Sequence, residues 1–179
     1  MQALYEGRRD DVISMTFDVA LDQFEAAALG DVNRLRALLS GGDLEVDRKS
    51  DDGFTALHFA AFFGTSDATA ALLDAGADPS SVATNEMRVQ PLHSAAASRS
   101  TSTSRLLLEA GAPPDARQNG GYAPLHEAAL HGDVDLIELL LAYEASADVR
   151  NDEGQTPADL ARSEGHDEIA NGLEARLTS

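Results

Sequence analysis

The sequence contains no cysteine and carries little positive charge. Without cysteine, disulfides, thiol nucleophiles and cysteine-ligated zinc are all excluded. Lysine and arginine number 13 against 31 aspartates and glutamates, Lys49 is the single lysine, and the formal net charge is -18. A chain this acidic repels phosphate groups, so we expect no nucleic-acid binding and no binding to an anionic membrane surface.

Long apolar runs are also missing. No run approaches the roughly 20 residues needed to cross a bilayer. Charged residues stand at positions 6 and 8–11, where a signal peptide has its apolar core. We therefore expect a cytoplasmic protein. The composition, 43% hydrophobic and 25% charged, is typical of one soluble globular domain with a real core.

One short motif recurs along the chain. TALHFAA (55–61) is followed by QPLHSAA (90–96), APLHEAA (123–129) and the weaker TPADLAR (156–162), with steps of 35, 33 and 33 residues. Upstream, FEAAALGD (24–31) keeps the alanine and glycine core without the histidine. Each motif is followed by leucines at helical spacing and then by turn residues such as GADP (76–79). The pattern predicts two short helices and a loop in every unit.

This unit resembles the ankyrin repeat, whose signature is a Thr-Pro-Leu-His-x-Ala core repeated about every 33 residues. The resemblance implies an all-α fold, an ankyrin-repeat solenoid of paired short antiparallel helices with projecting hairpin-like loops. It predicts five repeats, at about 19–51, 52–86, 87–119, 120–152 and 153–179. Residues 1–18 are expected to form an N-terminal extension or a half-repeat cap.

The recurring histidines, His58, His93 and His126, have two interpretations. The resemblance implies a buried structural ladder, in which each imidazole bonds to backbone and to the hydroxyl of a capping threonine such as Thr55. A zinc site would instead need three or four ligands converging on one point. We therefore expect no metal and no cofactor. No nucleophile elbow and no glycine-rich phosphate loop occurs, so we expect no catalytic residues and no enzyme.

The resemblance also implies a map of the binding surface. In the family, the residue before the threonine slot, the pair after Ala-Ala and the pair at the loop tip face the concave groove. Carried over position by position, these slots give an apolar strip made of Phe54, Phe62, Phe63, Met87, Val89, Tyr122 and Leu130. Acidic residues flank the strip: Asp51, Asp52, Glu86, Asp152 and Glu153. An apolar strip rimmed by charge is typical of a protein-binding surface.

Burial inside the chain is the alternative for Phe54, Phe62 and Phe63. Phe62 would then pack between first helices, and Phe63 under the N-terminal repeat. The interpretation as partner anchors requires the three rings to remain open to solvent.

We therefore predict a protein–protein interaction module that binds through the concave face and loop tips of repeats two to four. The implied partner is a protein with a basic rim, and we expect a monomer. The alternative is an acidic inhibitor or nucleic-acid mimic acting through its surface charge. High acidity also keeps a protein soluble, and that remains a third reading of the net charge.

The third repeat departs from the pattern. Thr103 and Ser104 occupy slots that Leu136 and Ile137 fill in the fourth repeat, which removes apolar burial from the middle of the solenoid. We expect the backbone amides of this repeat to exchange their hydrogens fastest among the internal repeats. The run at 100–104 is either the start of a helix or a phosphorylation site.

Three other positions lack an expected glycine. Arg88 and Arg99 replace glycines in the third repeat, and Glu144 stands where Gly76 and Gly111 follow their second helices. That slot favours a positive φ. Either the turn changes type at Glu144 or this residue is strained.

Overall fold

The computed structural model describes residues 22–41 and 45–177, which form five helix pairs. The inner helix of each pair is α2 (Gln23–Leu29), α4 (Ala56–Phe62), α6 (Pro91–Ala97), α8 (Pro124–Leu130) or α10 (Pro157–Ser163). The outer helix is α3 (Val32–Ser40), α5 (Ser66–Asp74), α7 (Thr101–Glu109), α9 (Val134–Ala142) or α11 (Asp167–Arg176). The described residues contain no strand beyond one isolated bridge between Lys49 and Thr55, so the all-α prediction is confirmed.

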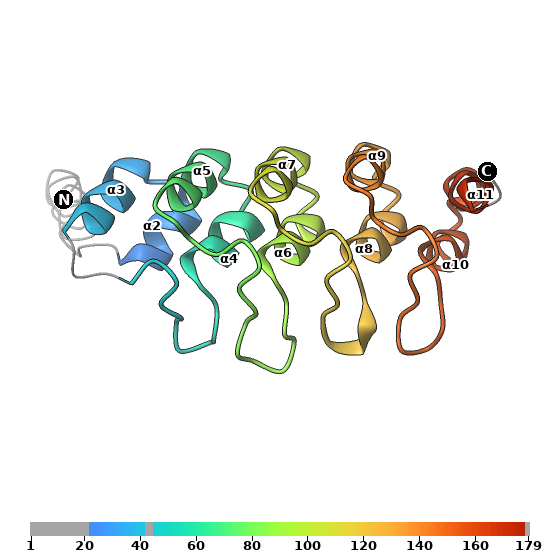
Figure 1. The fold of residues 1–179 in the computed structure, drawn as a ribbon, viewed down its shortest axis with the longest axis horizontal. Coiled ribbons are helices and arrows are strands. Elements are labelled where there is room, and N and C mark those ends of the chain that lie inside the picture. The colour runs from blue at the N-terminus through green and yellow to red at the C-terminus, as the bar shows by residue number, and fades with distance from the viewer. Residues whose placement is uncertain (1–21, 42–44, 178–179) are drawn as a thin grey trace, which may run out of the picture.

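The pairs stack side by side into an elongated solenoid (Figure 1). The inner helices form one row, the outer helices form a second row above it, and long loops project below the inner row. We call these loops fingers; they comprise residues 45–55, 75–90, 110–123 and 143–156, and the third contains the short 3-10 helix η1 (Asn119–Gly121). Each proposed repeat contains one helix pair. The repeat boundaries stay a prediction, and the predicted N-terminal extension, 1–18, lies outside the described residues.

Small side chains let the inner helices approach one another closely. α4 contacts both α2 and α6, and α8 contacts both α6 and α10. The alanine pairs of the motif lie at these contacts and are buried, as at Ala60 and Ala61, which are 0% exposed. The leucine before each histidine is also fully buried, as in Leu57, Leu92 and Leu125. Since an isolated pair cannot bury this surface alone, stacking is what creates the core.

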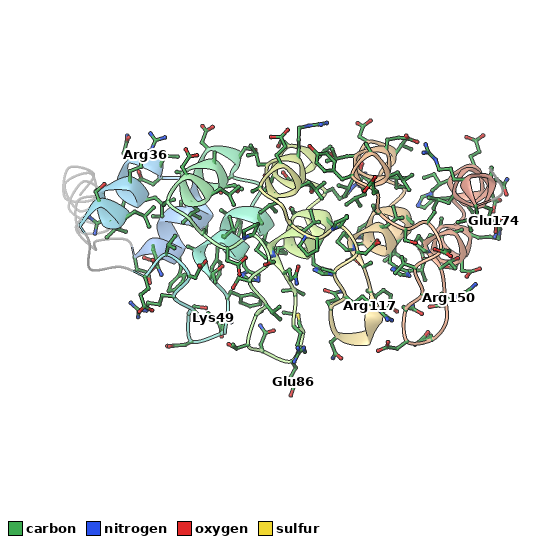
Figure 2. All side chains as sticks on the ribbon, in the orientation of Figure 1. Arg36, Lys49, Glu86, Arg117, Arg150 and Glu174 are labelled. Carbon is green, nitrogen blue, oxygen red and sulfur yellow. The ribbon has the colours of Figure 1, made fainter. Side chains whose placement is uncertain are left out.

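Neighbouring fingers are joined edge to edge by one recurring backbone hydrogen bond. Asn119 N–H donates to the Met87 carbonyl at 2.9 Å, and Asp152 N–H donates to the Gly120 carbonyl, also at 2.9 Å. Basic side chains add to these links (Figure 2). The Lys49 ammonium donates to the Val82 carbonyl at 2.6 Å, and the Arg117 guanidinium donates to the Arg150 carbonyl at 2.7 Å. The fingers therefore present a continuous surface rather than four separate loops.

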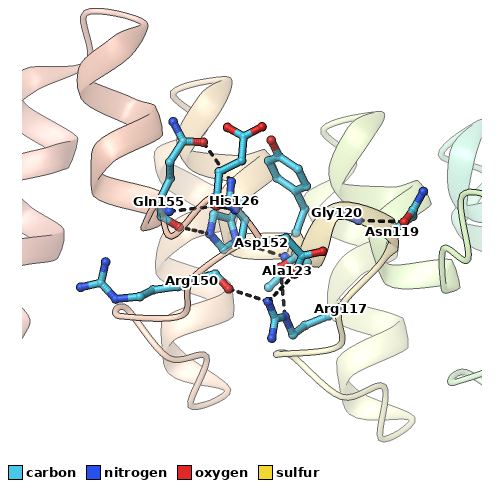
Figure 3. Close-up of polar contacts among 12 residues, drawn as sticks. Arg117, Asn119, Gly120, Ala123, His126, Arg150, Asp152 and Gln155 are labelled. Atoms are coloured by element: carbon cyan, nitrogen blue, oxygen red, sulfur yellow. Dashed lines mark hydrogen bonds and ion pairs between the residues drawn. The ribbon is translucent and has the colours of Figure 1, made fainter.

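The three motif histidines form the expected ladder. The Thr55 N–H donates to His58 Nδ1 at 3.2 Å, the Thr55 hydroxyl lies 2.8 Å from that nitrogen, and His58 Nε2 donates to the Val89 carbonyl at 3.1 Å. The same arrangement recurs where no threonine is present. His93 Nε2 lies 3.2 Å from the Tyr122 carbonyl, and His126 Nε2 lies 3.0 Å from the Gln155 carbonyl (Figure 3). Each imidazole thus ties its own helix to the next finger.

This ladder depends on neutral imidazoles. Burial disfavours the charged ring and lowers the pKa of His58 to about 4, against the opposing effect of its bond to the Val89 carbonyl. Burial likewise lowers the pKa of His93 and of His126. In the last repeat Asp159 takes the histidine's place, and bonds from the Thr156 backbone and hydroxyl lower the pKa of its carboxyl.

The three non-glycine residues keep the glycine conformation. Arg88, Arg99 and Glu144 have φ values of 52°, 57° and 66°. The turn after α9 therefore does not change type, and Glu144 adopts the left-handed conformation that disfavours a side chain. At Arg99, the guanidinium lies 3.7 Å from Asp133, which caps α9, so this departure adds a contact between repeats.

The polar slots of the outer row are buried as expected. Thr103 and Ser104 are both 0% exposed, and so is Thr69 in the equivalent slot of α5. Thr103 receives a hydrogen bond from the Ser100 hydroxyl. The hydroxyls of Thr69 and Ser104 have no hydrogen-bond partner among the described residues. Two desolvated polar groups without partners weaken the middle of the solenoid.

Candidate functional site

A groove of about 460 Å³ opens on the finger side of α4 and α6. Its walls come from three consecutive repeats, because the fingers before α4, α6 and α8 all contribute side chains. The apolar part is lined by Phe54, Phe59, Phe62, Phe63, Met87 and Val89. Five of these six are residues that the sequence predicts for the binding surface.

Phe62 and Phe63 form the exposed edge of this apolar part. Phe62 is 53% exposed and Phe63 is 58% exposed. Their rings meet edge to face, with centroids 5.4 Å apart. Met87, from the finger before α6, is 52% exposed. Within the described residues, Phe62 and Phe63 therefore do not pack inside the chain.

Phe54 has a different environment. It is half-buried, with its ring 5.7 Å from the His58 imidazole and 5.9 Å from the Phe59 ring, whose own ring lies 5.7 Å from Phe24. The ring thus helps to cover the first rung of the ladder. Substitution of Phe54 would alter stability as well as any surface property.

Polar side chains also line the groove, among them Ser94, Gln118 and Glu127. Within the described residues, none of these three side chains forms a hydrogen bond to another part of the protein. The Glu127 carboxylate lies 4.0 Å from His131 Nε2, and the Glu127 side chain is 27% exposed. A carboxylate that receives no hydrogen bond from the described residues therefore lines the same groove as the aromatic side chains.

The remaining predicted residues lie outside the groove. Tyr122 is half-buried with its ring 5.7 Å from that of His126, and Leu130 is half-buried at the end of α8. The groove is therefore lined by the part of the predicted apolar strip that lies over repeats two and three, and its lining does not include Tyr122 or Leu130.

The predicted acidic rim lies at the finger tips. Asp51, Asp52 and Glu86 are exposed and make no ion pair within the described residues. Figure 2 shows Glu86 at the end of its finger, pointing away from the helices.

The C-terminal end of the rim is partly neutralised. Asp152 and Glu153 are exposed, but the Asp152 carboxylate lies 3.2 Å from the Arg117 guanidinium (Figure 3). The free negative charge of the rim is thus greatest near Glu86 and the first finger.

Sequence reasoning missed several lining residues. Phe59, Ser94 and Glu127 all follow the motif histidine directly, so they occupy one slot in three successive repeats. The slot could have been found from the chain itself. It is the variable letter in TALHFAA, QPLHSAA and APLHEAA, between leucine-histidine and two alanines. Gln118, by contrast, reaches the groove through its finger, and no repeated letter marks it.

The part of the chain that the structure describes contains neither a metal-binding group of side chains nor a membrane-spanning helix. No group of three or more histidine, cysteine, aspartate or glutamate side chains is arranged to hold a metal ion. No described helix has both the length and the apolar character needed to cross a membrane.

Comparison with protein families agrees with the helix pairs and the ladder. The model for ankyrin repeats (3 copies) matches residues 24–118 and 92–175. The chain is an ankyrin-repeat protein. Ankyrin repeats are generally protein–protein interaction modules, and ankyrin-repeat proteins are typically scaffolds without enzymatic activity. A search of curated proteins finds no match to this ankyrin-repeat chain.

Proposed function

We propose that this ankyrin-repeat protein binds a partner protein through the groove over α4 and α6 and the adjacent finger tips. The observation that carries the proposal is the pair Phe62–Phe63, two large aromatic side chains that remain more than half exposed beside further apolar groups. A single exposed apolar residue needs no explanation, but a cluster rimmed by charge is typical of an interaction site.

The energetic contribution of this pair is substantial. Complete burial of a phenylalanine side chain stabilises by about 1.5–3 kcal/mol. Since about half of each ring is already covered, partner binding would gain about half that amount per residue. The pair would then contribute about 1.5–3 kcal/mol, which corresponds to an affinity change of roughly 10- to 100-fold.

The ladder and the finger links support a preformed surface. Hydrogen bonds from His58 to Val89 and from Asn119 to Met87 fix the backbone on either side of the groove. A rigid surface loses little conformational entropy on binding, so more of the contact energy appears as affinity. The free carboxylates near Glu86 would favour encounter with a basic rim.

The test is a capture experiment on lysate of the native host with the double variant Phe62→Ser/Phe63→Ser. Phe54 is left unchanged because its ring covers His58. The matched control is Val134→Ser, since Val134 is also an exposed apolar residue, 55% exposed, but lies on the outer row. We expect all three proteins to have melting temperatures within a few degrees of each other, and only the groove variant to lose the captured partner.

Two outcomes would contradict the proposal. One is an unchanged set of captured proteins with the groove variant. The other is a large loss of thermal stability in that variant, which would mean that the rings serve the fold.

The acidic surface itself is the alternative binding element, as in an inhibitor or nucleic-acid mimic. Binding through distributed charge weakens steeply with salt, whereas binding through apolar anchors does not. Capture that survives raised salt but is lost with the groove variant favours the anchors. Capture that is lost with salt and retained by the groove variant favours the charged surface.

A further inference from the structure

The groove combines two chemistries that a single ligand must satisfy together. Its lining combines aromatic and aliphatic side chains with the polar side chains of Ser94, Gln118 and Glu127. A purely apolar ligand would desolvate these polar groups without giving them partners, which is unfavourable. An acidic ligand would in addition meet the Glu127 carboxylate.

Glu127 supplies the carboxylate among the residues that line the groove. It lies in the first turn of α8. The ladder bond between His126 and the Gln155 carbonyl fixes the start of that same helix (Figure 3). With the His131 nitrogen 4.0 Å away and no hydrogen bond from the described residues, the carboxylate keeps its accepting positions open to the groove.

Two other residues of the groove lining, Ser94 and Gln118, also carry hydrogen-bond acceptors. Ser94 is 8% exposed, and its hydroxyl makes no hydrogen bond to the described residues. Gln118 contributes an amide, which both accepts and donates. Three acceptors from α6, α8 and the intervening finger therefore line one groove.

We propose that the groove takes a peptide segment in which a bulky apolar side chain is accompanied by an arginine. This inference rests on the proposed function and specifies the chemistry of the partner at that site. The apolar side chain packs against Phe62 and Phe63, and the arginine lays its alkyl stem along the groove. The guanidinium reaches the Glu127 carboxylate.

Arginine fits the acceptors of Ser94, Gln118 and Glu127 better than lysine does. Its guanidinium presents a planar fork of N–H donors that can engage a carboxylate and a second acceptor at once, while a lysine ammonium acts as a compact point charge. Its flat face also stacks on aromatic rings. The groove lining offers both features, aromatic rings and several acceptors.

The charge around the groove favours the same ligand. Three carboxylates, those of Asp51, Asp52 and Glu86, stand on the adjoining finger tips. They outnumber the one basic side chain of the finger that carries Glu86, which is Arg88. The protein as a whole carries a formal charge of -18. A cationic segment is thus attracted before it docks, whereas an acidic segment is repelled.

The experiment titrates the full-length, ¹⁵N-labelled protein with synthetic octapeptides in a glycine–serine background. One position is Phe or Ala, and another, separated from it by one to four residues, is Arg, Lys, Gln or Glu. Affinities and the location of binding are read from amide chemical shifts. The comparison uses the wild type, Glu127→Gln, the Phe62→Ser/Phe63→Ser double variant, and Glu109→Gln, which removes a carboxylate from an exposed site on α7 outside the groove.

In the wild type and in Glu109→Gln, we expect Phe–Arg peptides to bind about 5- to 10-fold more tightly than Phe–Gln peptides, with lysine intermediate and Phe–Glu weakest. In Glu127→Gln, the Arg-to-Gln ratio should fall to about one while the Phe-to-Ala ratio is retained. The double variant should show the converse, loss of the Phe-to-Ala ratio.

An Arg-to-Gln ratio that Glu127→Gln leaves unchanged overturns the inference while the proposed function stands. Equal binding of lysine and arginine overturns the arginine assignment, and absence of binding by every peptide to the wild type also counts against it. The proposed function fails separately, through its own test, if the double variant still captures the partner.

Discussion

Acidification is expected to destabilise this protein through His58. In the folded chain burial lowers the pKa of His58 to about 4, whereas an unfolded histidine has a pKa of about 6.5. Below pH 6.5 the unfolded state therefore binds a proton that the folded state does not. The stabilising contribution is fully present above pH 6.5 and is lost as the pH falls toward 4. The difference of about 2.5 pH units corresponds to about 3 kcal/mol for this one residue.

Urea denaturation followed by circular dichroism between pH 7 and pH 4 measures the effect. The variant His58→Gln removes the titrating ring, and His131→Gln serves as the control because His131 is exposed. Although His58→Gln also loses the bond to Val89, the quantity of interest is the change of unfolding free energy with pH. That change should be about 3 kcal/mol smaller in His58→Gln than in the wild type, and unaltered in the control.

The pH window separates the histidines from the acidic groups. The pKa of Asp159 is lowered below its ordinary value of 3.8, so its stabilising contribution is lost only at still lower pH. Repulsion among the many carboxylates acts in every variant alike and is reduced by salt. If His58→Gln retained the full pH dependence of the wild type, the reasoning about the buried ladder would be wrong.

Three further outcomes follow from the irregular positions. Replacement of Ser104 by Ala, or of Thr69 by Val, should raise the free energy of unfolding by about 1 kcal/mol, because each removes a buried hydroxyl without a partner; a loss of stability in urea denaturation would contradict this. Glu144→Gly should stabilise by up to about 1 kcal/mol since it relieves a side chain held at φ 66°, and an unchanged or lowered urea midpoint would refute that. Hydrogen exchange should be fastest, among the internal repeats, in residues 87–119; equal protection from repeat two to repeat four would count against it.

The sequence predicted only some of the residues that line the groove. Phe54, Phe62, Phe63, Met87 and Val89 were found because each repeat places the same slots on the same face. The extent of the exposed strip was not found, because exposure depends on which neighbour covers a slot. Tyr122 occupies the same slot as the others but does not line the groove.

The acidic rim was likewise only partly predictable from the sequence. The acidic residues of the finger tips are plain in the sequence, yet the ion pair between Arg117 and Asp152 joins residues 35 positions apart on adjacent fingers. No local pattern announces such a contact. The position of Glu127 directly after its histidine was visible in the sequence, but its place in the lining of the same groove as Phe62 and Phe63 was not.

By itself the sequence determined the repeating helix pairs, and its resemblance to ankyrin repeats implied the buried alanines and the histidine ladder. The helix pairs depend on residues a few positions apart and on an interval of about 33 residues, so a linear pattern contains them. Only the tertiary structure decided which side chains remain open, which acids are already paired and where aromatic and acidic groups meet. Those properties arise from side chains of three stacked repeats converging on one surface, and the distances between repeats exist only after the chain has folded.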